Sequence, residues 1–179
     1  MSITDQTISD FKWHFHSVRG FQAVPTQVTN GDGKKKFNYS AIKNQLNDQN
    51  WRNHFKTEVG LTPSPIVEEN LCSWGAIDVD DYTVEGKLEV IKKAKTLKLV
   101  PAETKSGGLH LYCFVDVEVQ ARNMRAYLSY CRKELGLDPK TEIFPKQNEV
   151  KEDEYGNGIT IPYRSTESIK IRLQKELQY

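Results

Sequence analysis

The stretch Trp74-Gly75-Ala76-Ile77-Asp78-Val79-Asp80-Asp81-Tyr82 decides the fold of this chain, because it carries two carboxylates at the end of an apolar, strand-like run. Side chains of a β-strand alternate between its two faces, along a rise of ~3.3 Å per residue. Gly75, Ile77 and Val79 are therefore expected on one face, and Ala76, Asp78 and Asp80 on the other. The two acids then share one surface at a Cα spacing of ~7 Å.

Two carboxylates side by side on a half-buried surface repel each other unless a cation lies between them. Hard divalent ions such as Mg2+ or Mn2+ take carboxylate oxygens as ligands. Asp78 and Asp80 are therefore candidate metal ligands. A strand end that frays into solvent, with Asp81 and Tyr82 opening a turn, would give the same pattern, so the spacing alone leaves both interpretations open.

A glycine-rich turn follows later in the chain. Lys105-Ser106-Gly107-Gly108 separates the run 99–104 from a second apolar run, 109–115, and this pattern predicts a β-hairpin. Gly107 and Gly108 can adopt positive φ and let backbone N–H groups approach an anion, and Ser106 adds a hydroxyl donor. His110 is expected on the polar side of the second strand, where a lone histidine can equally be an ordinary surface residue.

A third acid and a base come next. Glu142 opens the short strand-like run 142–144, and Lys146 follows directly after Pro145. Lys146 is a candidate phosphate contact, although an exposed lysine with no function would look the same, and Arg164 is a second such candidate. The run 156–164 predicts a turn that leads into a strand over Ile159–Tyr163.

Taken in order, acid-x-acid, Ser-Gly-Gly-x-His and an acid that opens a short strand resemble the archaeo-eukaryotic primase superfamily. The flanking runs 51–55, 142–147 and 156–163 are similar to primase-polymerase catalytic domains of phage and mobile-element replication proteins and of bacterial conflict systems. The resemblance implies that Asp78, Asp80 and Glu142 are catalytic and bind two Mg2+ or Mn2+ ions. It also implies that the nucleotide's phosphates are bound by the hairpin, which supplies Ser106, Gly107, Gly108 and His110, with Lys146 as a further contact.

The chain departs from the family pattern in two places. Three residues separate Ser106 from His110, where the short form of the motif has one, and Glu142 stands where many members have aspartate. Neither change removes a ligand, because glutamate also binds a hard cation. His54 and Lys56 resemble an amino-terminal motif near the nucleotide or the template, with no role that the spacing assigns.

The alternation of elements predicts the fold. After Asn70 we expect a strand (72–80), a helix (84–97), a hairpin (99–115), a helix (120–135), strands at 142–144 and 159–163, and a helix (165–177). This is an α+β fold, with an antiparallel sheet of the RNA-recognition-motif-like (ferredoxin-like) type backed by helices on one face and open to ligands on the other. The helices are expected to bury two apolar stripes, Val84, Leu88, Ile91 and Leu97 in one and Ala121, Met124, Leu128, Cys131 and Leu135 in the other.

We predict one catalytic domain over residues 1–179, with an N-terminal α/β subdomain (1–70) and a catalytic subdomain (71–179). In the first, helices are expected around 40–46 and 49–55. Lys34-Lys35-Lys36 is expected in a solvated loop, although a loop beside a template groove would look identical.

Composition limits the remaining choices. The chain has 179 residues, 37% of them hydrophobic, which is enough for one core without disulfide staples. Its formal net charge of +1, from 25 basic and 24 acidic residues, gives no overall nucleic-acid signal. Cys72, Cys113 and Cys131 have no paired spacing, which favours neither a disulfide framework nor a zinc site and fits the reducing cytoplasm of a bacterium, or of the host cell of a phage or mobile element. No apolar run has membrane-spanning length, so no membrane partner is expected.

Template-directed nucleotidyl transfer is the function we expect. Its partners would be a single-stranded DNA template, a primer and NTP or dNTP, together with the helicase to which relatives are often fused. A metal-dependent nuclease would also use clustered acids and a histidine, but it has no need of a triphosphate-binding hairpin. A non-catalytic module could stack bases on Trp74 and Tyr112, although acids on that face would repel phosphate.

Overall fold

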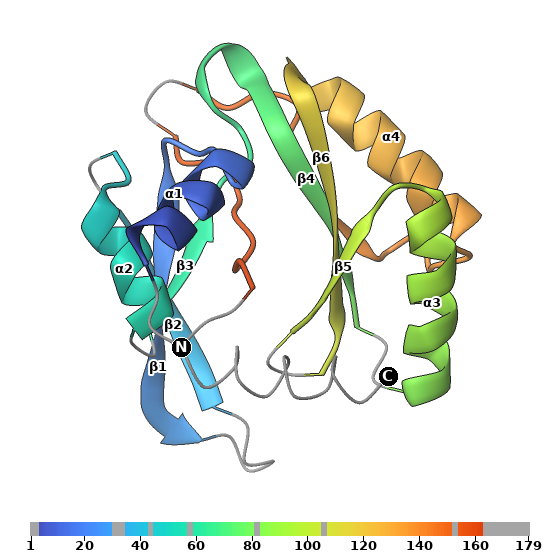
Figure 1. Cartoon of the computed structure of the whole chain (residues 1–179), viewed down its shortest axis with the longest axis horizontal. Helices are drawn as coiled ribbons and strands as arrows, with labels where there is room; N and C mark the ends of the chain where they lie inside the picture. The colour runs from blue at the N-terminus through green and yellow to red at the C-terminus, as the bar shows by residue number, and fades with distance from the viewer. Residues whose placement is uncertain are drawn as a thin grey trace.

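The computed structural model describes residues 4–29, 35–42, 45–56, 59–80, 83–104, 107–151 and 154–162. Helices and strands alternate along the chain, and the fold is mixed α+β with antiparallel strand pairing (Figure 1). The elements are α1 (Asp5–His14), β1 (Gly20–Thr29), β2 (Lys35–Ala41), α2 (Asp48–Lys56), β3 (Gly60–Pro63), the 3-10 helix η1 (Glu68–Asn70), β4 (Leu71–Val79), α3 (Val84–Thr96), β5 (Val100–Glu103), β6 (Leu109–Gln120), α4 (Ala121–Glu134) and β7 (Glu142–Phe144).

Within these described residues the strands form two sheets, one ordered β2-β1-β3 and the other β5-β6-β4-β7. In the second sheet β4 lies between β6 and β7, and all neighbouring strands are antiparallel. Asp78 of β4 pairs with His110 of β6 on one side and with Glu142 of β7 on the other. The register therefore places an acid, a second acid and the histidine in one row across three strands.

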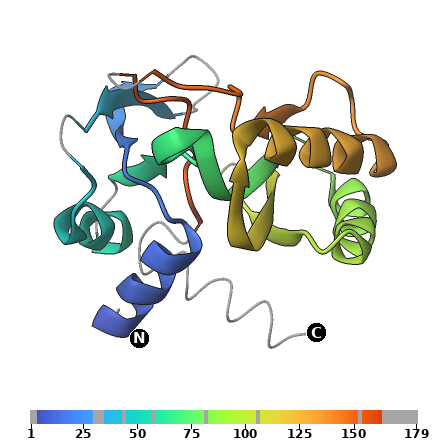
Figure 2. The same cartoon turned by 90° about the horizontal axis from the view of Figure 1, so that it is seen from above.

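One face of this second sheet is covered by α3 and α4, as both views show (Figures 1 and 2). The alternation expected for β4 is confirmed here, because Ile77 and Val79 are buried in the core under these helices. Gly75 lets α4 approach closely, since a Cβ there would lie 2.7 Å from the carbonyl oxygen of Phe144 and 2.8 Å from Met124 and Leu128 side-chain atoms.

Helix α4 buries the stripe that the sequence predicts, with Ala121, Met124, Leu128, Cys131 and Leu135 all at most 4% exposed. For α3 the predicted stripe is wrong in part. Leu88 is 52% exposed, and Val90 and Ala94 are buried in its place. The helix is therefore rotated from the orientation that its bulkiest side chains suggested, and the small Ala94 fits against the sheet.

The other face of the sheet is not open, which corrects the prediction of a free platform. Phe15, next to the C-terminal end of α1, packs edge-on against Trp74, Tyr112 and Phe114, with ring centroids 5.1–5.3 Å apart. Trp74 is 0% exposed and Tyr112 is 1% exposed. Phe15 and the other buried residues of the core cluster on this face therefore cover Trp74 and Tyr112, and stacking of bases on either ring is excluded.

A segment near the end of the described chain, residues 154–162, runs between the two sheets (Figures 1 and 2). Its backbone pairs with β3 through hydrogen bonds from Ile159 N to Pro63 O (3.3 Å) and from Ile161 N to Leu61 O (3.2 Å). Residues 159–162 are not assigned to a strand, contrary to expectation. Gly158 is required for the close approach, because a Cβ there would lie 2.5 Å from Thr62 O.

Two further predictions in the first 70 residues are wrong. Ser40 and Ala41 end β2 rather than begin a helix, and Lys35 and Lys36 open that strand rather than lie in a loop. The helix expected over 49–55 is confirmed as α2. The helix expected over 165–177 and Arg164 lie outside the described residues, as does Lys34. None of the helices in the described part of the chain combines the length and apolar character needed to cross a bilayer.

Candidate functional site

The face of the sheet that packs against Phe15 carries buried aromatic rings, but at one end it carries polar side chains. On β4 the series Trp74, Ala76, Asp78 passes from buried to partly exposed, and on β6 the series Phe114, Tyr112, His110 ends at the same level. The Asp78 side chain is 28% exposed and the His110 side chain 12%. The sheet thus presents a carboxylate and an imidazole at the edge of a buried aromatic core.

His110 contacts a partner through each ring nitrogen. Its Nε2 atom lies 3.4 Å from Oδ1 of Asp78, and its Nδ1 atom lies 2.9 Å from the Tyr112 hydroxyl. The Tyr112 hydroxyl also lies 3.4 Å from the carbonyl oxygen of Thr160, in the segment between the sheets. His110 is therefore a fixed member of a hydrogen-bonded chain rather than a freely rotating surface residue.

Glu142 is held by Lys146, with Nζ 2.6 Å from Oε1. The same ammonium group lies 4.9 Å from the centroid of the Phe144 ring, within the range of a cation–π contact. The backbone that carries Lys146 is fixed by Arg125 of α4, which donates to the carbonyl oxygens of Pro145 (2.9 Å) and Lys146. The Phe144–Pro145 peptide bond is cis.

Asp80 follows β4 by one residue and is exposed. Among the described residues, no group of three or more His, Cys, Asp or Glu side chains is gathered closely enough to hold a metal ion. The donor types nevertheless suit a hard divalent cation, because Asp78 and Glu142 are paired residues on adjacent strands and Asp80 lies two residues beyond. Carboxylates of paired residues on one face can meet through side-chain rotation alone.

The glycine-rich turn between β5 and β6 is closed by its own backbone. Thr104 N donates to Gly108 O (2.9 Å), and Gly107 N donates to Thr104 O (3.1 Å). Gly107 has φ +94°, so a positive φ is required there as expected. The Gly107 amide is thus used within the turn, and Ser106 lies outside the described residues.

Comparison with known protein families assigns the chain to one of them. A family model described as the archaeo-eukaryotic primase domain of TOTE conflict systems matches residues 12–171. The chain belongs to this family. The expected membership of the primase superfamily is confirmed, and the description names conflict systems, one of the settings that the motifs resemble. No curated protein matches the chain.

In this primase-family domain His54 has a structural role, because it bridges buried backbone groups. It is 0% exposed, accepts a hydrogen bond from Leu61 N at Nδ1 (3.1 Å), and its Nε2 lies 2.8 Å from Pro162 O. These contacts assign the neutral ring with the proton on Nε2. His54 therefore joins α2, β3 and the 154–162 segment, and its buried ring is unavailable to nucleotide or template.

Sequence reasoning missed the hydrogen-bonding role of Tyr112 and Thr160 in this primase-family domain. From the sequence, Tyr112 is a candidate only for a platform on which bases stack. The signal that could have found the contact is the spacing of His110 and Tyr112, since residues i and i+2 of a strand lie on one face. No local pattern could have found Thr160, because it reaches Tyr112 from 48 residues away in the chain.

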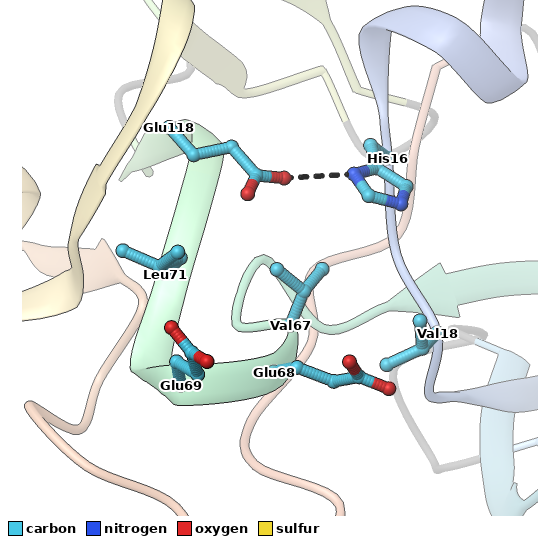
Figure 3. A pocket seen from close by; sticks show the side chains of 7 residues that line it. All are labelled: His16, Val18, Val67, Glu68, Glu69, Leu71 and Glu118. Carbon is cyan, nitrogen blue, oxygen red and sulfur yellow. Dashed lines mark hydrogen bonds and ion pairs between the residues drawn. The ribbon is translucent and has the colours of Figure 1, made fainter.

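A pocket of about 290 Å³ lies elsewhere in the primase-family domain (Figure 3). It is lined by His16, Val18, Val67, Glu68, Glu69, Leu71 and Glu118. A hydrogen-bond contact of 3.0 Å between His16 Nδ1 and Glu118 Oε1 crosses one side of it. Leu71 and Glu118 belong to the far end of β4 and β6 from Asp78 and His110, so this pocket is separate from the candidate site.

Proposed function

We propose that this domain catalyses template-directed nucleotidyl transfer, making and extending primers on single-stranded DNA from NTP or dNTP. The observation that carries the proposal is the row formed by Asp78, His110 and Glu142 on three adjacent strands. Family membership supports the reaction class, since the primase family is nucleotidyltransferase-like. An acid pair beside an imidazole suits a metal-bound triphosphate.

The order of elements supports an RNA-recognition-motif-like arrangement for the part that begins at β4. Strand, helix, strand, strand, helix and strand follow one another from β4 to β7, and β4 and β6 lie at the centre of the sheet. We propose that residues 71–179 form the catalytic subdomain and residues 1–70 an N-terminal subdomain. The N-terminal part contributes Phe15 and the strands against which the 154–162 segment packs.

Asp78, Asp80 and Glu142 are the residues that we propose to hold Mg2+ or Mn2+. Bound there, the two ions would lower the pKa of the attacking 3′-hydroxyl and neutralise the leaving pyrophosphate. His110 would donate from Nε2 to a phosphate oxygen, together with groups of the glycine-rich turn. Lys146 pairs with Glu142 here, and its ammonium group would become available to a phosphate oxygen if a cation took its place at that carboxylate.

The exposure of the acids at this site explains why a non-catalytic binding module fits less well. The aromatic rings that such a module would expose are buried, whereas the acids are exposed or partly exposed. Free, buried Cys72, Cys113 and Cys131 fit our proposal of a cytoplasmic protein.

A labelled primer annealed to single-stranded DNA tests the proposal. With Mg2+ or Mn2+ and nucleotide, the proposed activity lengthens the primer. Shortening of the primer would indicate a nuclease, and retarded migration without any change in length would indicate a binding module. Either of those results, with protein of confirmed fold, would reject nucleotidyl transfer.

A further inference from the structure

Tyr112 lies directly behind His110 and is almost completely buried, with 1% of the residue exposed. Its hydroxyl is 2.9 Å from His110 Nδ1 and 3.4 Å from Thr160 O. A buried tyrosine hydroxyl needs a hydrogen-bond partner, and here the nearer partner is the imidazole of the candidate site. The contact therefore links the site to the interior of the protein.

The ring of Tyr112 has little freedom to move this hydroxyl away. Phe15 packs edge-on against it at 5.1 Å, and Phe114 lies stacked at 6.0 Å. Trp74 lies at 6.2 Å and is fixed by its own hydrogen bond from Nε1 to His16 O (2.9 Å). Close packing of this kind keeps side chains in one rotamer. The hydroxyl of Tyr112 is thus held in one place, and its contact with Nδ1 fixes the orientation of the His110 ring.

The partners of His110 determine which nitrogen carries the proton in the neutral ring. A carboxylate can only accept hydrogen bonds, so Asp78 requires a proton on Nε2. The unprotonated Nδ1 must then accept, and a tyrosine hydroxyl is able to donate. The single hydroxyl proton of Tyr112 has two possible acceptors, Nδ1 at 2.9 Å and Thr160 O at 3.4 Å. The contact with Nδ1 is the shorter and stronger, so Tyr112 donates there, and Nε2–H points toward Asp78 and the space beside it.

We propose that Tyr112 is a positioning residue, whose hydroxyl holds His110 in the Nε2–H form with that N–H directed at the triphosphate. The role in nucleotide binding rests on the proposed function, whereas the control of the imidazole does not. Asp78 alone is a weak orienting group, because 3.4 Å is longer than a good N–H···O hydrogen bond. The Tyr112 contact, at 2.9 Å, is the shorter of the two.

The control of the imidazole is tested without any ligand. Long-range 1H–15N spectra of the neutral ring distinguish its two tautomers, and we expect a single Nε2–H form of His110 in the wild-type protein. In Tyr112→Phe, which removes only the hydroxyl, we expect a mixture of both forms. Tyr130→Phe, at a 52% exposed tyrosine of α4, is the matched control and should match wild type. Identical tautomer populations in wild type and Tyr112→Phe would overturn the proposal.

The consequence for nucleotide binding is tested by a double-mutant cycle with titration of nucleotide and Mn2+. Loss of one hydrogen bond predicts about fivefold weaker binding in Tyr112→Phe. In a His110→Ala background the same change should have no further effect, because the residue through which Tyr112 acts is gone. An equal loss in both backgrounds would indicate a merely structural role and overturn the proposal. If wild type bound no nucleotide, the proposed function would fail, and the tautomer spectra would still decide the positioning role.

Discussion

The Asp78 carboxylate and the His110 imidazole face each other across β4 and β6, with Oδ1 and Nε2 3.4 Å apart. The two residues are register partners, and Glu142 is the partner of Asp78 on its other side. A sequence that places an acid, a histidine and an acid far apart is thus folded into a single row.

Removing the charge of Asp78 should abolish nucleotide transfer and leave the fold intact. Asp78→Asn keeps the shape of the side chain, so we expect the melting temperature to hold or rise as acid–acid repulsion is relieved. The rate of incorporation should fall by about a hundredfold or more, because a metal ligand is lost. Asp80→Asn should behave in the same way. Activity near the wild-type level in the Asp78→Asn and Asp80→Asn double variant would remove both acids from the site.

His110→Ala should separate two kinds of binding. The affinity for nucleotide and the rate of incorporation are expected to fall, since the imidazole is assigned to the triphosphate. Affinity for single-stranded template should stay nearly unchanged. Fluorescence anisotropy with labelled DNA and a nucleotide titration measure the two separately. A collapse of template affinity with unchanged nucleotide affinity would place His110 in a nucleic-acid groove.

Glu142 should tolerate a shorter carboxylate but not the loss of its charge. Glu142→Gln keeps the size of the side chain, and we expect a steep fall in transfer even at saturating Mg2+, with partial activity in Glu142→Asp. Glu149→Gln, at an exposed acid seven residues later, is the control. Wild-type rates for Glu142→Gln across a metal titration would show that its contact with Lys146 is an ordinary surface ion pair.

Gly75 should be the position in β4 that is most sensitive to added volume. Gly75→Ala places a Cβ 2.7 Å from a backbone oxygen, so β7 or α4 must shift, and we expect a loss of about 1–3 kcal/mol in the free energy of unfolding. Gly136→Asn serves as the control. A Cβ there meets nothing within 4 Å, and asparagine tolerates the positive φ of +70°. Equal urea midpoints for Gly75→Ala and wild type would contradict the close packing of α4 on β4.

Alkaline pH should destabilise the fold through its buried thiols. Burial raises the pKa of Cys72 from its ordinary value of 9.0 to about 12, and that of Cys113 to about 11. Below pH 9 both thiols are protonated in the folded and unfolded chains and have no effect. Above pH 9 the thiols of the unfolded chain lose their protons, whereas those of the folded chain keep them. The free energy of unfolding therefore falls as the pH rises toward the pKa values of the folded thiols.

Urea unfolding between about pH 7.5 and about pH 10.5 measures this decline. Cys72→Ala removes one of the two thiols with a raised pKa. The free energy of unfolding of this variant should therefore fall less steeply with pH than that of the wild-type protein. Parallel curves for the two proteins would show that Cys72 ionises equally well in both states.

The second sheet could be predicted from the sequence because its signals are local. The strand that carries Asp78, the helix after it and the short strand at Glu142 all lie within one or two residues of their expected positions. The row formed by His110, Asp78 and Glu142 could be predicted only in part. Alternation along a strand fixes which side chains share a face, whereas it does not fix the register between strands that makes these three residues neighbours. Helix α4 was predictable because its apolar stripe is continuous.

What could not be predicted depends on contacts between distant parts of the chain. Nothing in the sequence around Trp74 indicates that Phe15 will cover it, so a buried ring looked like a binding platform. The orientation of α3, which exposes Leu88 and buries Ala94, depends on how the helix packs on the sheet, and its own apolar pattern does not fix that. His54 looked functional because a histidine beside a recognised motif is indistinguishable, in sequence alone, from one that bridges buried backbone groups.

De novo synthesis on an unprimed single-stranded template tests the central claim most directly. Wild-type protein, given labelled nucleotides of each sugar type with Mg2+ or Mn2+, should make metal-dependent products that extend on further incubation. Asp78→Asn, at equal concentration and with the same melting temperature, should make none. Products of equal yield from Asp78→Asn, or no product from folded wild-type protein with either metal and either nucleotide, would contradict the claim.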